Sequence, residues 1–255
     1  TNSDPRIIEE FEYCLKKFDP ELQLLEHNKY GYRISNPQFR NVVISLKNFK
    51  RHHEGIFTKG SKMAYKKRSI RIFLEEHNLF KKGSVDRCIP DLIFGLKKEH
   101  LALFLNRLFS CDGSIYNFTG RWEISYSSSS EKMIKQVHHL LLRFGIQSKI
   151  RNKKIKYNNK LFDSFEIEIG SSNVDLFLME IGFFGRKKEK QNLCLEDTKN
   201  LLRNPNVDTI PKDIWIFYRP SNWAEVGRAV SYAHPKAMRE RIRYSPSRHT
   251  LLQIA

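Results

Sequence analysis

Apolar residues recur at helical spacing along residues 101–112, and the run ends abruptly on Asp112 and Gly113. Gly113 is a typical residue at the end of a helix, because glycine tolerates the left-handed backbone that often occurs there. Asp112 is unexpected, since the C-terminal end of a helix carries partial negative charge and favours cations. The pattern therefore predicts a helix whose last residue needs a further explanation.

The same periodicities predict the other elements, with a 3.6-residue period for helices and strict alternation for strands. Helices are expected at residues 5–18 (N-capped by Asp4), 69–79, 130–146 and 172–183, strands at 30–35, 121–127 and 164–170, and a hairpin over 148–170 with its tip at 157–160. The pattern is weak over residues 37–68, which include the basic run 59–68.

The order of these elements repeats along the chain. Residues 98–190 read helix, strand, strand, helix, strand, strand, helix, and residues 4–80 read as a weaker copy of that order. We interpret this as an internal duplication with a period of about 100 residues. Beyond residue 215, three short helices are expected, forming either a small helix-turn-helix-like unit or a helical brace across the core.

The charge balance indicates what the protein binds. The 255 residues contain 45 Lys+Arg and 28 Asp+Glu, a formal net charge of +17. An excess of this size favours a polyanionic partner, either nucleic acid or, less often, a membrane surface, over a merely solubilising surface. No apolar run reaches the roughly 18 residues of a membrane-spanning helix, and the N-terminal residues lack the apolar segment of a signal peptide. We therefore expect a soluble, cytoplasmic protein.

The four cysteines do not indicate a metal site. They are Cys14, Cys88, Cys111 and Cys194. Because they lie far apart and none forms a CxxC pair, neither a zinc site nor a disulfide framework is expected.

Three segments point to a family. Residues 105–113, "LNRLFSCDG", resemble the LAGLIDADG motif. Residues 125–148 and 206–215 resemble the segments downstream of the second such motif in the homing-endonuclease domains of inteins, including those of bacterial replicative helicases. The resemblance implies an α+β LAGLIDADG homing-endonuclease fold, built of αββαββα repeats whose strands form a DNA-binding saddle. Its parts would be an incomplete first repeat with linker at 1–97, a second repeat at 98–190 and a C-terminal helical extension at 191–255.

The resemblance also implies a catalytic role for Asp112, which matches the acid of the second motif. Asp112 would bind a divalent metal ion, and its hard oxygen ligands suit Mg²⁺. Lys187 and Lys188, in the basic turn after the last helix, are candidates for stabilising charge in the transition state. Arg87 stands where the family pattern has a lysine before "IP", which argues against a general base there. The alternative is that Asp112 is a simple turn residue.

The polar face of the expected sheet is the candidate DNA-binding surface. Side chains expected to remain free to face base edges or water are Arg121, Glu123, Ser125, Glu166 and Glu168. Those expected to contact phosphates are Lys149, Arg151, Lys153, Lys154 and Lys156. Strand side chains can read the hydrogen-bonding pattern of base pairs in the major groove. The alternative is an ordinary solvated sheet face.

Only one motif is found, whereas a monomeric member of this family carries two. The first motif helix is therefore expected upstream of residue 1, on a separate N-terminal fragment or, less favoured, replaced by a second copy in a homodimer. Without that helix, Leu101, Leu105 and Leu108 are expected to lie open. The resemblance favours a site-specific double-strand DNA endonuclease of a bacterium, bound to the nucleoid when active. The alternatives are a DNA-binding protein that no longer cleaves and an RNA-splicing maturase.

Overall fold

The computed structural model describes most of the N-terminal three quarters of the chain and short stretches beyond it. The described residues are 2–37, 69–170, 172–199, 209–218, 221–222, 225, 245–248 and 251–252. They fall into two compact units, residues 1–196 and 197–255. The basic run 59–68 and most of the helices predicted beyond residue 215 lie outside the described residues; α9 (Ile214–Phe217) is described in the second unit.

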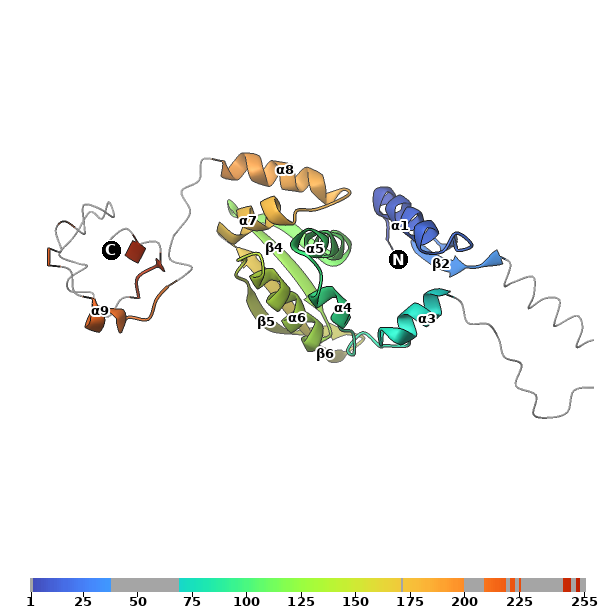
Figure 1. The fold of residues 1–255 in the computed structure, drawn as a ribbon, viewed down its shortest axis with the longest axis horizontal. Helices are drawn as coiled ribbons and strands as arrows, with labels where there is room; N and C mark the ends of the chain where they lie inside the picture. Colours follow the sequence, from blue (N-terminus) through green and yellow to red (C-terminus); the bar gives the residue numbers. More distant parts are fainter. Residues whose placement is uncertain are drawn as a thin grey trace, which may run out of the picture. The chain divides into compact units, whose positions relative to one another are not determined.

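The first unit contains a four-stranded antiparallel sheet with helices on one face (Figure 1). Its strands, in the order β3-β4-β6-β5, are β3 (Gly113–Phe118), β4 (Arg121–Ser128), β6 (Lys160–Gly170) and β5 (Lys149–Tyr157). The helices over it are α5 (Lys98–Asp112), α6 (Glu131–Leu142) and α7 (Ser172–Glu180), with the short α4 (Asp91–Phe94) before them and α8 (Lys187–Thr198) after. This arrangement confirms the predicted α+β class.

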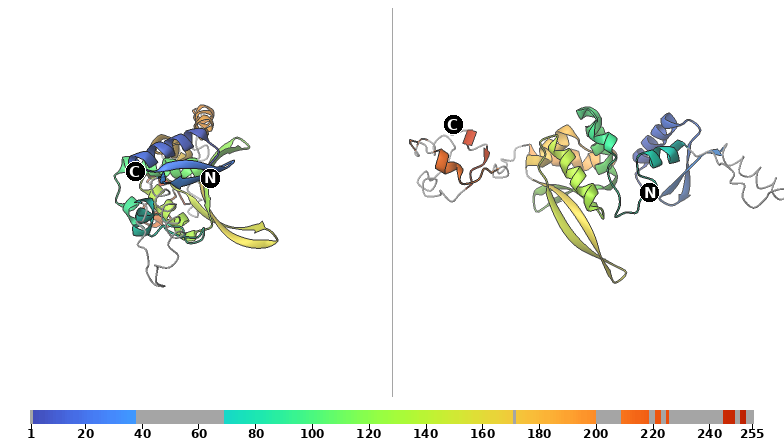
Figure 2. Two further views of the ribbon diagram at one scale, coloured as in Figure 1. Left: turned by 90° about the vertical axis from the view of Figure 1, so that its right-hand side faces the viewer. Right: turned by 60° about the horizontal axis from the view of Figure 1, so that its bottom comes forward.

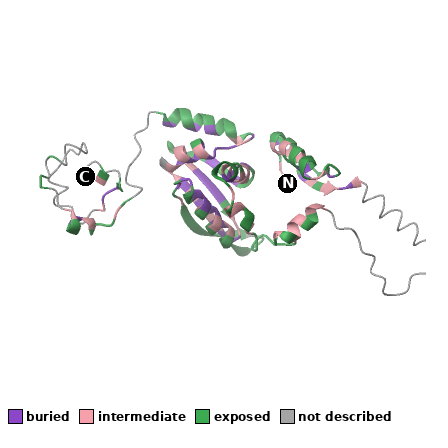
Figure 3. Cartoon of the chain, viewed as in Figure 1, coloured by how far each residue is buried: buried purple, intermediate pink, exposed green. Residues whose placement is uncertain are grey.

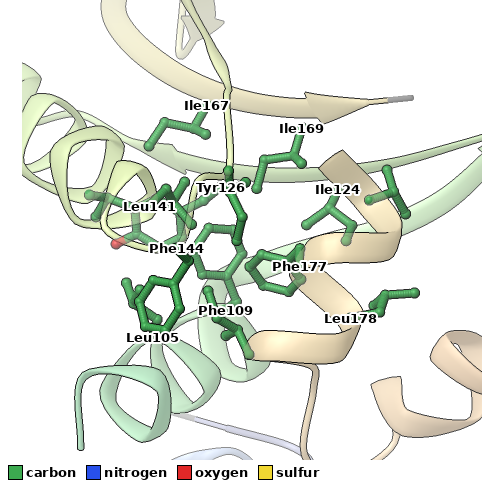
Figure 4. Close-up of a cluster of buried hydrophobic side chains, with 14 of the residues drawn as sticks. Leu105, Phe109, Ile124, Tyr126, Leu141, Phe144, Ile167, Ile169, Phe177 and Leu178 are labelled. Carbon is green, nitrogen blue, oxygen red and sulfur yellow. The ribbon is translucent and has the colours of Figure 1, made fainter. Parts of the chain in front are cut away.

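The core lies between the sheet and its three helices, where the buried residues of the strands gather (Figure 3). Ile124 pairs in register with Ile115 on one side and Ile169 on the other, so three strands present isoleucine at one level. Figure 4 shows Leu105 and Phe109 of α5 packed into this cluster. Each buried side chain of this kind contributes roughly 1.5–3 kcal/mol.

The face of α5 that packs on the sheet differs from the expectation. Leu101 and Leu105 are fully buried against the chain's own core, so the prediction that they would lie open is wrong. Leu108 is partly buried beside the same core. The exposed apolar residue of this helix is Leu103, with 52% of its surface accessible.

The N-terminal part of this unit follows a similar order. It contains α1 (Pro5–Phe18), the hairpin of β1 (Gln23–Asn28) with β2 (Gly31–Ser35), and α3 (Ser69–Glu76). The order helix, hairpin, helix is the same as that of α6, β5–β6 and α7. β1 was not predicted, because its residues do not alternate between apolar and polar.

Local signals set the ends of several elements. Asp4 caps α1 as predicted, accepting a hydrogen bond from the Arg6 amide, with Pro5 in the first turn. Ser130 caps α6 through the amide of Met133. The helices end before Gly145 and Gly182, which have positive φ, so α6 and α7 are shorter than expected. Among the described helices none combines the length and apolar content that crossing a membrane requires.

The hairpin of β5 and β6 turns at Asn158 and Asn159, where the sequence predicted its tip. Both residues have positive φ, at 47° and 59°. Two consecutive positive φ values are typical of a two-residue turn whose twist matches that of the strands, and asparagine tolerates them well. Figure 2 shows the end of this hairpin extending past the helices.

Candidate functional site

Asp112 is the last residue of α5, and its side chain is exposed. β3 begins at the next residue, Gly113, with φ −79° and ψ 173°. The sequence had indicated that glycine is needed here for a left-handed backbone, but this backbone conformation is one that any residue can adopt. Glycine is required for space, because a Cβ atom would lie 2.7 Å from the carbonyl oxygen of Phe109. The close approach lets the chain pass from helix to strand within one residue.

A lysine compensates for the negative charge that an acid adds at the C-terminal end of α5. The ammonium of Lys187 donates to the carbonyl oxygens of Phe109 at 3.1 Å, Ser110 at 2.6 Å and Cys111 at 3.3 Å. These are the terminal carbonyls of α5, where a cation is favourable. The positive charge required beside Asp112 is thus supplied by the protein.

The electrostatic balance at Lys187 has two opposing parts. Burial of the half-buried ammonium lowers the pKa of Lys187, while the nearby Cys111, Asp112 and Asp4 favour its charged form. Burial also raises the pKa of the Cys111 thiol, with Asp112 acting in the same direction. A thiol shifted in this direction is a poor nucleophile, because the thiolate is the reactive form.

The loop that precedes Lys187, between α7 and α8, is fixed at several points. The amide of Phe184 donates to the Ser110 hydroxyl of α5 at 2.8 Å, and the amide of Phe183 donates to the Gln191 side chain at 2.8 Å. Asn106 of α5 donates to the carbonyl of Ile181 at 2.9 Å. Lys187, the first residue of α8, therefore reaches the end of α5 directly after a loop that is itself tied to α5.

The end of α5 offers one of the ligands that a metal ion would need. In the described residues no group of three or more His, Cys, Asp or Glu side chains could hold a metal. Mg²⁺ commonly uses only one or two carboxylates together with substrate phosphates and water. The exposed Asp112 carboxylate suits one such ligand. Lys188, the other predicted basic residue, lies exposed in the first turn of α8.

The second predicted part of the site is the face of the sheet opposite the helices. Arg151 of β5 donates to the Glu168 carboxylate of β6 at 2.8 Å, and Lys153 pairs with Glu166. The Ser127 hydroxyl also donates to Glu166, at 3.2 Å. The expectation that Glu166 and Glu168 remain free is therefore wrong, because both neutralise basic side chains of β5.

Glu123 of β4 is unusual on this face. Burial, together with a hydrogen bond to Glu168 and that group's negative charge, raises the pKa of Glu123 to about 7. A hydrogen bond from Tyr116 and the charge of Arg151 partly oppose this shift. Burial and the Glu123 carboxylate also raise the pKa of the Tyr116 hydroxyl. Two carboxylates in contact therefore lie among the cations of this surface.

Register separates the predicted DNA-binding residues into two groups. Eight belong to the face opposite the helices, by their alternation with the core residues: Arg121, Glu123, Ser125, Lys149, Arg151, Lys153, Glu166 and Glu168. Lys154 and Lys156 have the opposite orientation in the ladder, and Lys154 pairs with Asp163 at 3.2 Å. Ser125 is only 6% exposed, which leaves it the least accessible of the first group.

Sequence reasoning missed an apolar pair near the tip of the β5–β6 hairpin. Ile155 and Phe162 lie directly opposite each other, and each is 50% exposed. By alternation they share the face that carries Arg151 and Lys153. Counting the register outward from the Asn158–Asn159 turn would have placed them there.

A helix that ends in an acid and continues into an antiparallel sheet with a charged open face is the arrangement expected of a LAGLIDADG domain. Residues 99–182 match the family described as a LAGLIDADG-like domain. Residues 99–182 are therefore similar to a LAGLIDADG-like domain, and the resemblance seen in the sequence is confirmed for this part of the chain.

Known proteins are similar over part of the chain. It is 32% identical over 161 residues to the replicative DNA helicase DnaB of Synechocystis sp., covering 60% of this chain and 18% of that protein. It is 38% identical over 118 residues to the replication factor C small subunit of Methanocaldococcus jannaschii, covering 46% and 6%. The chain thus spans less than a fifth of these curated relatives. A solved structure, I-SmaMI bound to uncleaved DNA target in the presence of calcium ions, has a TM-score of 0.39 at 12% identity, covering 78% of this chain and 80% of that one.

Proposed function

We propose that this chain is a site-specific double-strand DNA endonuclease of the intein-homing type, which hydrolyses phosphodiester bonds with a divalent metal ion. The observation that carries the proposal is the end of α5, where an exposed acid, Asp112, lies beside an ammonium, Lys187, held on the last helical carbonyls. The net charge of +17 and the charged open face of the sheet support duplex DNA as the substrate. We place its action in the bacterial cytoplasm, on the nucleoid.

In this mechanism the protein's own groups have separate tasks. Asp112 would hold Mg²⁺ together with a scissile phosphate, and the bound ion would activate water and stabilise the departing 3′ oxygen. Lys187 would add positive charge beside the phosphate as negative charge develops, which is the kind of electrostatic stabilisation that lowers barriers most. Lys188 is exposed in the next position and is the second candidate for this task. The residues of the open sheet face would bind the DNA on either side of the cut.

A second function, DNA binding without cleavage, is favoured by one observation. No acidic group in the described residues joins Asp112 to form a metal cluster of three or more ligands. A scaffold that has lost part of its catalytic set would keep the basic surface and bind DNA through it. The two functions differ in the chemical step alone.

We further propose a protein partner for the open side of α5, either an N-terminal fragment carrying the first motif or, less favoured, a second copy of this chain. Leu103 is 52% exposed, and Phe104 and Leu108, which pack against the core with one side, keep part of their surface accessible. These apolar residues give a partner helix a surface to cover. Light scattering of the chain alone and with the upstream segment would test this: a 1:1 complex supports the fragment, and a dimer of the chain alone supports the second copy.

The test of the main proposal uses a plasmid carrying a cognate target site without an intein, incubated with the chain and Mg²⁺. Linear product formed only in the presence of metal supports the endonuclease. A mobility shift without any cut supports the binding protein. Preferential binding to intron RNA over the plasmid would indicate the maturase instead.

A further inference from the structure

Two capping residues each do a second task, at corresponding places in the two similar parts of the first unit. Asp4 precedes α1, and Ser130 precedes α6; both are buried, at 7% and 0% exposure. Each satisfies the first turn of its own helix. Each also binds the backbone of a basic residue that lies far away in the sequence, which a helix cap does not need.

At Asp4 the second contact holds the loop after α7. One carboxylate oxygen accepts from the Arg6 amide at 3.1 Å, and the other accepts from the Arg186 amide at 2.7 Å. Gly185 lies against the same carboxylate with φ +70°, and a Cβ atom on it would overlap the Asp4 oxygen. The loop is therefore shaped to receive this side chain at Gly185 and Arg186, the two residues before Lys187.

At Ser130 the second contact holds the segment after α3. The hydroxyl accepts from the Met133 amide at 3.3 Å and donates to the Arg87 carbonyl oxygen at 2.6 Å. Asp4 thus belongs to the N-terminal part and holds a basic segment of the C-terminal part, whereas Ser130 does the reverse. The chemistry fits each place, because a carboxylate can only accept from an amide and a hydroxyl can donate to a carbonyl.

We propose that Asp4 is a positioning residue for Lys187. It fixes Arg186 and thereby directs the Lys187 ammonium to the carbonyls at the end of α5. The inference rests on the proposed function for its effect on cleavage, while its geometric part stands on the contacts of Asp4 alone. One consequence concerns the segment that begins α1, which lies outside the LAGLIDADG-like residues 99–182. This segment is required to place Lys187 correctly beside Asp112 at the end of α5.

Asp4→Ser in the full chain separates the two tasks of this residue. Serine is as good a helix cap as aspartate, so α1 is kept, but its single, shorter oxygen cannot also reach the Arg186 amide. The matched control is Glu9→Gln, which removes one negative charge from an exposed position of the same helix. Three quantities are measured for each variant: the amide hydrogen exchange of Arg186, the rate of single-turnover cleavage with the protein in saturating excess over the DNA, and the Kd for the same duplex.

In Asp4→Ser we expect the Arg186 amide to exchange about tenfold faster or more, since a hydrogen bond to a carboxylate is lost. We expect cleavage to slow about tenfold, with Kd within about twofold of the Glu9→Gln value. Unchanged exchange at Arg186, or a rate loss matched by an equal loss of affinity, overturns the proposal. If the unaltered chain binds DNA without cutting it, the endonuclease function fails by itself. The exchange of Arg186 then decides whether Asp4 fixes this loop.

Discussion

The end of α5 and the open face of the sheet both carry charge, but they arrange it in opposite ways. At the helix end, the backbone holds one ammonium, Lys187, and the carboxylate of Asp112 makes no hydrogen bond or ion pair with any described residue. On the sheet, Arg151 and Lys153 are paired with acids of the neighbouring strand. Loss of the one unpaired acid at the helix end should remove the activity of that site. Loss of one member of the ion-pair network on the sheet should reduce DNA binding only in part, because many residues contribute to it. The first arrangement suits chemistry and the second suits recognition.

Asp112→Asn should have the largest effect, and this effect should be confined to cleavage at the end of α5. The substitution keeps the shape of the side chain and removes the charge that a metal ion requires, so cutting of at least one strand should fall below detection. DNA affinity should remain within about threefold, because the lost interaction belongs to the chemical step. Plasmid cleavage and a filter-binding assay on the same preparation measure the two effects. Cleavage equal to that of the parent would mean that Asp112 only ends the helix.

Salt should act strongly on binding by the surface as a whole. If six or more phosphates are contacted, affinity should fall about a thousandfold between about 50 and 200 mM salt. Substitutions of single lysines test whether unpaired and paired cations contribute differently to this salt dependence. Lys149→Gln removes an exposed cation of the open face that has no charged partner among the described residues, and it should reduce the slope of log K against log salt by about one. Lys153→Gln removes a cation of the same face that is already paired with Glu166, and it should change the slope less. A nearly flat plot for the parent chain would remove the electrostatic argument.

The two regions also differ in how far the sequence predicts them. Alternation alone assigns Trp122, Ile124 and Tyr126 to the core face of β4, because the side-chain period of a strand is two. The ion pairs on the other face could not be predicted, since each is diagonal. Arg151 lies opposite Glu166 in the register but pairs with Glu168. Such pairing depends on the twist of the hairpin and on the reach of long side chains.

At the end of α5 the acid was predicted and its companion was not. Lys187 was identified as a basic residue in a turn, but nothing local connects it with carbonyls 76 to 78 residues earlier. That connection requires α7 to fold back across the sheet and Asp4 to hold the loop. Likewise, Gly113 was interpreted through backbone freedom, whereas its conformation is ordinary and the close approach of Phe109 demands glycine. Local patterns predict elements, but contacts between distant elements decide these roles.

The apolar pair at the hairpin tip should contribute a smaller, base-dependent effect. Ile155 and Phe162 share the open face, where apolar groups can contact the methyl group of thymine in a major groove. Replacing both by serine should weaken binding about tenfold, and replacing a contacted thymine by uracil should weaken the parent about fourfold for each methyl lost. Leu142→Ser, an exposed position on α6, is the control. The same uracil effect in the double variant would show that these residues do not read the methyl groups.

Glu123→Gln should produce the smallest effect, on stability rather than binding, and it tests whether the acids of the network conflict. The pKa of Glu123 is raised from 4.5 to about 7, first by burial and then by Glu168, so its anionic form is disfavoured in the folded chain. Below about pH 4.5 the folded and unfolded chains are both protonated and no penalty exists. Between pH 4.5 and 7 the unfolded chain ionises first, and stability falls as pH rises. The glutamine variant avoids this loss, so at pH 8 it should exceed the parent by about 1 kcal/mol or less, because solvent screens this partly exposed group. Urea unfolding at pH 5 and pH 8 measures the difference, with Glu9→Gln as the control. An equal difference at both pH values would mean that Glu123 ionises as freely in the folded chain as in the unfolded one.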